Sequence, residues 1–196
     1  MSKRIDPRQC CGVIVDVQEF FLAQLPKRDR ARVETNTRNF ATLLGYFRIP
    51  VLVTVERPLE HKGMLPAKIG RRLGRTATTF EKDFFDLTQE KPIRDHLRRL
   101  KKKQAIVAGC ETDVCVLQSC LGLIGLGFDV FVVEELIFSG ARNVESALTR
   151  MKNEGAIFLT YKTLYYELFQ AVEGTGRTLA ERLGPYPDDL PDAALE

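Results

Sequence analysis

The sequence predicts a single α/β domain, in which a mainly parallel sheet lies between two layers of helices. Short apolar runs typical of buried strands alternate with longer segments whose apolar residues recur at helical spacing. This alternation favours right-handed crossovers and a sheet covered on both faces. A chain of 196 residues with 44% hydrophobic content can bury one substantial core. We therefore expect one domain over residues 1–183.

The predicted elements follow in order along the chain. Helices carry an inner apolar stripe, such as Phe40, Leu44 and Phe47 in the first of them. The segment 56–75 contains several prolines and glycines, so it is expected to be irregular, either bordering a site or forming a mobile surface connection. The proline-rich, acidic tail at 184–196 is expected to be poorly ordered or to lie at a subunit interface. Strands are predicted near 11–16, 50–55, 76–80, 104–109, 128–133 and 156–159, and helices near 30–47, 91–101, 113–126, 143–153 and 163–173.

The segment IVAGCETDVCV, residues 106–116, is the most informative for function. It reads as a buried strand that passes through Gly109 into a polar turn. Thr112 is a good N-cap for a helix starting at Asp113, which puts Cys115 in the first turn. Unpaired N–H groups and the helix dipole at that point are expected to favour the thiolate. A thiol in the first turn of a helix is typical of a cysteine nucleophile, although many free cysteines are inert core residues.

Two further residues have the right chemistry to assist such a cysteine. Asp16 follows the apolar run Val13–Val15, at the end of a predicted strand where ligand crevices open in doubly wound sheets. A carboxylate there could accept the thiol proton and later protonate a leaving amine. Lys82 could stabilise a thiolate by its charge. Taken alone, Asp16 reads equally well as a turn residue, and Lys82 as a surface lysine.

Three ordered segments, VIVDVQEFF, TTFEKDFFDL and GCETDVCV, resemble the motifs of the isochorismatase-like cysteine hydrolases, a superfamily that includes nicotinamidases and N-carbamoylsarcosine amidase. The resemblance spans roughly residues 10 to 170. It implies a six-stranded sheet of order 3-2-1-4-5-6 and a catalytic triad of Asp16, Lys82 and Cys115. It also implies an oxyanion hole formed by the backbone N–H groups of Glu111 and Cys115, with a cis peptide bond between Cys110 and Glu111.

The activity implied by this resemblance is attack of Cys115 on a small amide, followed by hydrolysis of a thioester. No cofactor is expected. Nicotinamidases bind a metal through an aspartate and histidines in the region that here offers only Glu56 and His61, so no metal site is expected and nicotinamide hydrolysis is disfavoured. Phe20, Phe21 and Glu56 are candidates for lining the substrate pocket, with core packing an equal reading for at least one phenylalanine. Family members commonly form dimers or tetramers, so a homo-oligomer is expected.

Several other functions remain open. The chain could be a catalytically retired binding or scaffold protein of the same fold, or a redox-sensing thiol protein, given Cys110 close to Cys115. Vinyl ether hydrolysis of the isochorismatase type and nicotinamidase activity are alternative enzyme readings. True isochorismatases lack the cysteine, so Cys115 favours amide or related acyl chemistry.

Composition excludes other classes. The net charge is only +3, and the basic clusters at 71–72, 98–99 and 101–103 are interrupted, so no nucleic-acid partner is expected. No apolar run is long enough for a membrane span. Five cysteines without a secretory signal favour a reducing cytoplasm over a disulfide scaffold. Cys10, Cys11 and Cys120 are expected to be core thiols, and a structural zinc site is improbable with two histidines in the chain.

Overall fold

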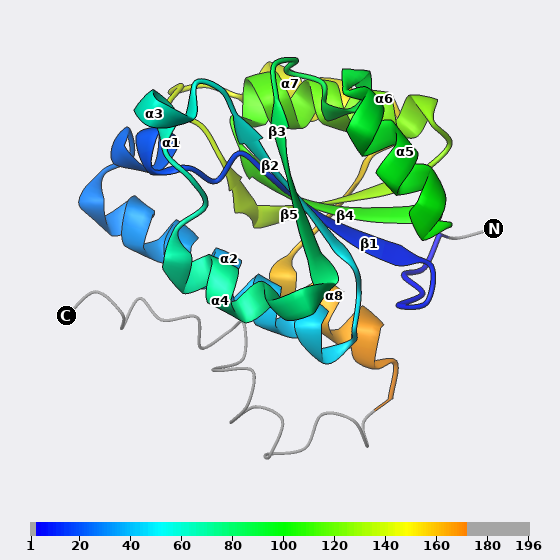
Figure 1. The fold of residues 1–196 in the computed structure, drawn as a ribbon. Helices are drawn as coiled ribbons and strands as arrows, with labels where there is room; N and C mark the ends of the chain where they lie inside the picture. Colours follow the sequence, from blue (N-terminus) through cyan, green and yellow to red (C-terminus); the bar gives the residue numbers. More distant parts are fainter. Residues whose placement is uncertain (1–2, 172–196) are drawn as a thin grey trace.

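A six-stranded parallel sheet forms the centre of the protein, whose computed structural model describes residues 3–171 (Figure 1). The strand order is β3-β2-β1-β4-β5-β6, and every neighbouring pair is parallel. This confirms the predicted fold class and the order implied by the resemblance. The strands are β1 (Cys10–Val15), β2 (Val51–Glu56), β3 (Ala77–Lys82), β4 (Gln104–Cys110), β5 (Asp129–Phe138) and β6 (Ile157–Leu159).

Helices cover both faces of the sheet, as the alternating pattern predicted (Figure 1). One apolar core joins the sheet to α2 (Lys27–Tyr46), α4 (Ala67–Leu73) and α8 (Tyr161–Phe169). The second joins the opposite face to α5 (Lys91–Leu100), α6 (Leu117–Gly125) and α7 (Glu145–Asn153). Within residues 3–171, no helix is long and apolar enough to cross a membrane.

The buried cysteines agree with the prediction that most thiols of this chain belong to the core. Cys10, Cys11 and Cys120 are fully buried, the first two on β1 and the third on α6. Cys10 packs in the first core and Cys11 in the second, because successive side chains of a strand point to opposite faces of the sheet. These three thiols therefore serve packing.

The segment 56–75 is more regular than its composition suggests. It contains α3 (Leu59–Lys62), α4 and a short 3-10 turn, η1 (Gly74–Thr76). Ile69 and Leu73 of α4 are buried against α2, so this half of the segment is part of the core. The first half, with α3, lies next to the carboxyl end of β2. Short helices this close to prolines and glycines leave no long apolar stripe, which is why the sequence did not reveal them.

The helix expected from Asp113 also begins differently. Residues Thr112–Val116 form a wider π-helical turn, η3, and the regular helix α6 starts only at Leu117. Thr112 is buried and makes no N-cap; the residue preceding the turn is Glu111, which has no side-chain cap hydrogen bond. α8 ends at Phe169, a few residues before the predicted end at 173. A further 3-10 turn, η2, covers Leu87–Gln89, and a short helix, α1, covers Glu19–Ala23. The predicted tail at 184–196 lies outside the described residues.

Candidate active site

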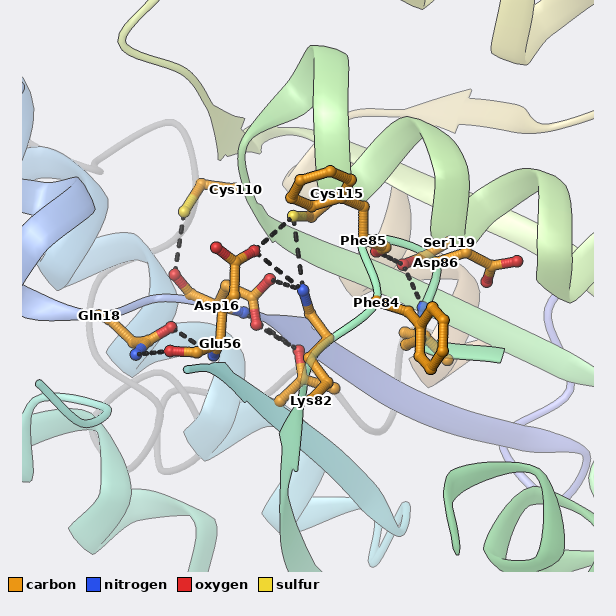
Figure 2. A network of polar contacts seen from close by, with 12 residues as sticks. Asp16, Gln18, Glu56, Lys82, Phe84, Phe85, Asp86, Cys110, Cys115 and Ser119 are labelled. Atoms are coloured by element: carbon orange, nitrogen blue, oxygen red, sulfur yellow. Dashed lines mark hydrogen bonds and ion pairs between the residues drawn. The ribbon is translucent and has the colours of Figure 1, made fainter. Parts of the chain in front are cut away.

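Four adjacent strands deliver polar side chains to one edge of the sheet. Asp16 follows β1, Glu56 ends β2, Lys82 ends β3, and Cys110 ends β4, leading to Cys115. Because the strands are parallel and adjacent, their carboxyl ends meet at this edge. The structure thus brings together Asp16, Lys82 and Cys115, which are far apart in the sequence (Figure 2).

Asp16 is completely enclosed and fixed on several sides. Its backbone is left-handed, with φ of 48°, which turns the chain sharply at the end of β1. The Thr54 hydroxyl donates to Oδ1 at 2.8 Å, and the thiol of Cys110 donates to the Asp16 carbonyl at 2.9 Å. Burial raises the pKa of Asp16, although the Lys82 ammonium and the Thr54 hydroxyl oppose the rise. The carboxyl group is therefore held in one orientation.

Lys82 lies at the centre of the site and is fully buried. Its Nζ is 2.7 Å from Oδ2 of Asp16, 3.2 Å from Oε2 of Glu56 and 3.5 Å from Sγ of Cys115 (Figure 2). Burial alone would lower the pKa of this lysine, but the negative charge of Asp16 outweighs burial and raises the pKa above its usual range. The side chain is therefore an ammonium ion that joins all three partners.

Cys115 is almost fully buried in η3, and its Sγ faces a carboxylate as well as the ammonium. The thiol donates to Oε2 of Glu56 at 3.1 Å, and Lys82 approaches from the other side. Burial and the nearby charge of Asp16 raise the pKa of the thiol. This direction is opposite to the expected preference for a thiolate, because burial and two carboxylates outweigh the ammonium.

Glu56 takes a more central place than the pocket-lining position predicted from the sequence. Its Oε1 accepts from Nζ of Lys62, while Oε2 contacts Cys115 and Lys82. Burial opposes its charge, but the contacts with Lys62, Cys115 and Lys82 lower its pKa below the usual range. Glu56 is therefore ionised at neutral pH, and it pairs in register with Lys82 across β2 and β3.

Gln18 fixes the backbone of this carboxylate, a role that sequence reasoning missed. Its Oε1 accepts from the Glu56 N–H at 2.7 Å, and its Nε2 donates to the carbonyl of Glu56 at 3.1 Å and to that of Gly63 at 2.7 Å. The side chain is fully buried. The only available signal was a polar residue two positions after Asp16, at the end of a buried strand. Lys62 was also missed, because one lysine among many carries no signal.

The remaining predicted residues surround this cluster. The peptide bond between Cys110 and Glu111 is cis, and the carbonyl of Glu111 accepts from Val114 N and Val116 N on either side of Cys115. Phe20 and Phe21 lie on α1, with ring centroids 5.3 Å apart.

The two phenylalanines differ in their surroundings. Phe21 is buried in the core, and its ring centroid is 5.8 Å from Nζ of Lys62. Phe20 is only partly buried and packs against the ring of His61 at 5.0 Å between centroids. Both therefore stand beside α3, the element that carries Lys62 to Glu56. Phe21 therefore packs in the core, whether or not it also lines a substrate pocket.

A cation site can be considered for the same cluster. One potential ligand atom each from Asp16, Glu56 and Cys115 lies within 4.8 Å of the others. The ammonium of Lys82 already contacts all three residues and supplies the positive charge that a metal ion would bring. His61 packs against Phe20 instead of joining the cluster. The donor set therefore fits an internal ion-pair network better than a metal ion.

Comparisons with known proteins identify the family of this chain. The isochorismatase domain model matches residues 10–163, and the chain belongs to this family. It is similar to isochorismatase family protein 1A of Dictyostelium discoideum, with 29% identity over 84% of this chain and 80% of the relative. It is also similar to the secreted isochorismatase effector Isc1 of Phytophthora sojae, with 28% identity over 84% of this chain and 79% of the relative.

Among solved structures, the chain has the fold of the YcaC gene product of Escherichia coli, described as an octameric hydrolase of unknown specificity. The TM-score is 0.88 and the identity 23%, over 100% of this chain and 96% of the other. At this identity the likeness supports the fold alone. The predicted isochorismatase-like α/β architecture is therefore shown by sequence family and by structure.

Proposed function

We propose that the protein is a cysteine hydrolase that acts on a small amide-like substrate through a thioester on Cys115. Asp16, Lys82 and Cys115 form its triad in this proposal. The observation that carries it is the position of Lys82 Nζ, within 2.7 Å of the Asp16 carboxylate and 3.5 Å of the Cys115 sulfur, in a fully buried site. A buried ammonium so placed can stabilise negative charge on sulfur as it develops.

The reaction has two stages in this proposal. Sγ of Cys115 attacks the carbonyl carbon, its proton passes to a carboxylate of the site, and the carbon–nitrogen bond breaks as the leaving amine takes up a proton. Water then attacks the thioester, releasing the acid and restoring the thiol. Because the resting thiol has a raised pKa, attack must be coupled to proton transfer and does not start from a stable thiolate.

The oxyanion of each stage needs donors that are already in place. We assign this role to the backbone N–H groups of Glu111 and Cys115, next to the cis bond that follows Cys110. Phe20, Phe21 and Glu56 are assigned to the substrate pocket. The identity of the substrate beyond a small amide is left to experiment.

We also propose that the protein works as a homo-oligomer, a dimer or a tetramer, in the cytoplasm. The octameric state of the YcaC gene product supports an oligomer, as do the exposed side chains of Phe84 and Phe85, two and three residues after Lys82. Five free cysteines support a reducing compartment. Light scattering coupled to size-exclusion chromatography measures the oligomeric state, and a monomer at micromolar concentration would contradict that part of the proposal.

A panel of small amides, assayed for ammonia release, tests the hydrolase proposal. The Cys115→Ala variant is expected to lose turnover by a factor of at least about 10³. Cys120→Ala is the matched control, because Cys120 is a buried thiol one helical turn further on and contacts neither Lys82 nor Glu56 through any described hydrogen bond. Failure of every amide, ester and vinyl ether, or full activity of Cys115→Ala, would contradict the proposal.

A further inference from the structure

The loop that follows Lys82 is fastened to α6 through one buried hydroxyl group. Ser119 of α6 is fully buried, and its Oγ accepts from the Leu87 N–H at 3.2 Å and donates to the Phe85 carbonyl at 3.2 Å (Figure 2). Resting on the proposed hydrolase function, we infer that Ser119 is a positioning residue, which holds Cys115 at the distance from the Lys82 ammonium that the reaction needs.

Both hydrogen bonds of the Ser119 side chain go to the backbone of this one loop. A hydroxyl group can donate and accept at the same time, which the methyl group of an alanine cannot do. Leu87 is fully buried, so loss of the hydroxyl would remove the partner of a buried N–H group, which is costly. Ser119 therefore favours close contact between the loop and α6.

The loop is short, and its backbone is held at each step between Lys82 and Phe85. The N–H groups of Asp83 and Phe84 donate to Oε1 of Glu90 at 2.7 and 3.4 Å. Phe85 follows, and its carbonyl accepts the hydrogen bond from α6. Because only two residues separate Lys82 from Phe85, a shift of the loop relative to α6 also shifts the end of β3, where Lys82 lies.

The loop contacts α6 at two points. Ser119 lies four residues after Cys115, which is about 6 Å of helical rise, so its hydroxyl acts close to the sulfur. Gly122 lies almost one turn further on, where a Cβ atom would meet the side chains of Asp86 and Thr88. Packing at Gly122 is therefore expected to keep the loop on α6 when the hydroxyl is removed, so that the contact opens only on the side of Cys115.

The separation of Lys82 from Cys115 depends on how two layers of the fold are joined. Lys82 lies at the carboxyl edge of the sheet, whereas Cys115 lies in η3, between β4 and α6. β4 fixes the start of η3, and Ser119 joins the helix that follows η3 to the loop that follows β3. A misplacement of about 1 Å between reacting groups can slow a reaction about 10²-fold. A contact that fixes this distance therefore matters for the rate.

The rate of Cys115 alkylation by iodoacetamide at pH 8 tests this assignment without any amide substrate. The second-order rate is followed by mass spectrometry, with fragment ions that separate Cys115 from Cys110 and Cys120. The charge of Lys82 lowers the pKa of the Cys115 thiol, so a more distant ammonium gives less thiolate. If Ser119→Ala lengthens the 3.5 Å contact by about 1 Å, the weaker attraction slows alkylation about sixfold at an effective dielectric constant of about 20. Simple loosening of the site predicts the opposite, because a more exposed thiol reacts faster.

Thr88→Val is the matched control, because it also removes one buried hydroxyl from the same loop. The Thr88 hydroxyl donates to Oδ1 of Asp86 at 2.7 Å, which lies within the loop. We expect Thr88→Val to lower the urea midpoint and to leave the alkylation rate unchanged, and Ser119→Thr, which keeps a hydroxyl, to restore the rate. The inference is overturned if Ser119→Ala reacts as fast as the unaltered protein or faster, or if Thr88→Val or a folded Ser119→Thr is equally slow.

Hydrogen exchange in the unaltered protein keeps the test decisive if Ser119→Ala does not fold. The Leu87 amide is expected to exchange as slowly as the amides of the central strands, because it is buried and bonded to Ser119. Exchange at the rate of an exposed loop would show that the contact is open in solution and would overturn the inference. Alkylation and exchange need no amide, so a negative amide panel would contradict the hydrolase proposal and leave the result on Ser119 readable.

Discussion

Replacement of Lys82 by methionine is the perturbation for which the structure gives the most definite expectation. Methionine fills a similar apolar volume but removes the ammonium that lies 2.7 Å from Asp16. Both side chains are fully buried, so the carboxylate left behind has neither a counter-ion nor water. Breaking a buried ion pair from one side costs about 3–5 kcal/mol of unfolding free energy. That is a large share of the ~5–15 kcal/mol by which proteins of this size are stable.

Lys62→Met is the matched control, because it removes the other ammonium of the same cluster. The Lys62 side chain is partly exposed, and Glu56 keeps its contact with Lys82. Solvent can compensate for part of the lost charge, so the expected cost is about 1 kcal/mol or less. Urea unfolding of both variants, monitored by circular dichroism, measures the difference.

The stability loss of Lys82→Met is expected to depend on pH. In Lys82→Met, burial still raises the pKa of Asp16, and the lysine no longer opposes the rise. An acid whose folded pKa lies above its unfolded value destabilises the protein as pH increases. The loss is therefore expected to be small below the unfolded pKa of about 4 and to grow toward neutral pH.

A second change isolates the cause of that loss. Adding Asp16→Asn to Lys82→Met is expected to recover part of the stability, because it removes the stranded charge. Equal losses for Lys82→Met and Lys62→Met, or a Lys82→Met loss that does not depend on pH, would refute the reasoning.

Two further predictions concern residues near the site. Cys110 is completely buried and its thiol donates to the carbonyl of Asp16, whereas Cys115 keeps a small exposed fraction beside the Lys82 ammonium. Brief treatment with iodoacetamide should therefore label Cys115 in preference to Cys110, and equal labelling in peptide mass spectra would argue against an inert Cys110. In α6, Gly122→Ala puts a methyl group against the side chains of Asp86 and Thr88 and should lower the free energy of unfolding in urea by about 1–3 kcal/mol. Gly125→Ala is the control, because its methyl group meets open space and should leave stability unchanged or raise it by up to about 1 kcal/mol. Equal effects of the two substitutions would show that the contact at Gly122 is not tight.

Local patterns in the sequence predicted most of the fold because buried strands and amphipathic helices have periods that a sequence displays directly. All six strands lie within a few residues of their predicted ranges, apart from β5, which continues to Phe138. The short helices α1, α3 and α4 were not predicted, since each is too short to show a periodic stripe. The π-helical turn at Thr112–Val116 was also missed, because the same residues are compatible with an ordinary helix start.

For the site, the resemblance of three ordered motifs to a known family selected Asp16, Lys82 and Cys115 as candidates, and the structure brings these three residues together. The sequence could not give the partners of Glu56. Its contacts with Cys115, Lys82 and Lys62 come from three other elements, at sequence separations of 59, 26 and 6 residues. Gln18 likewise gains its importance only where β1 and β2 lie side by side.

By itself, the sequence determined the alternation of strands and helices, the residues of both cores and the chemical types present at each strand end. These properties depend on neighbours along the chain. Only the tertiary structure decided which carboxylate touches the sulfur, and in which direction its surroundings shift the pKa of the thiol. That choice depends on the burial and the charges that parallel pairing of β1, β2, β3 and β4 brings to one edge of the sheet.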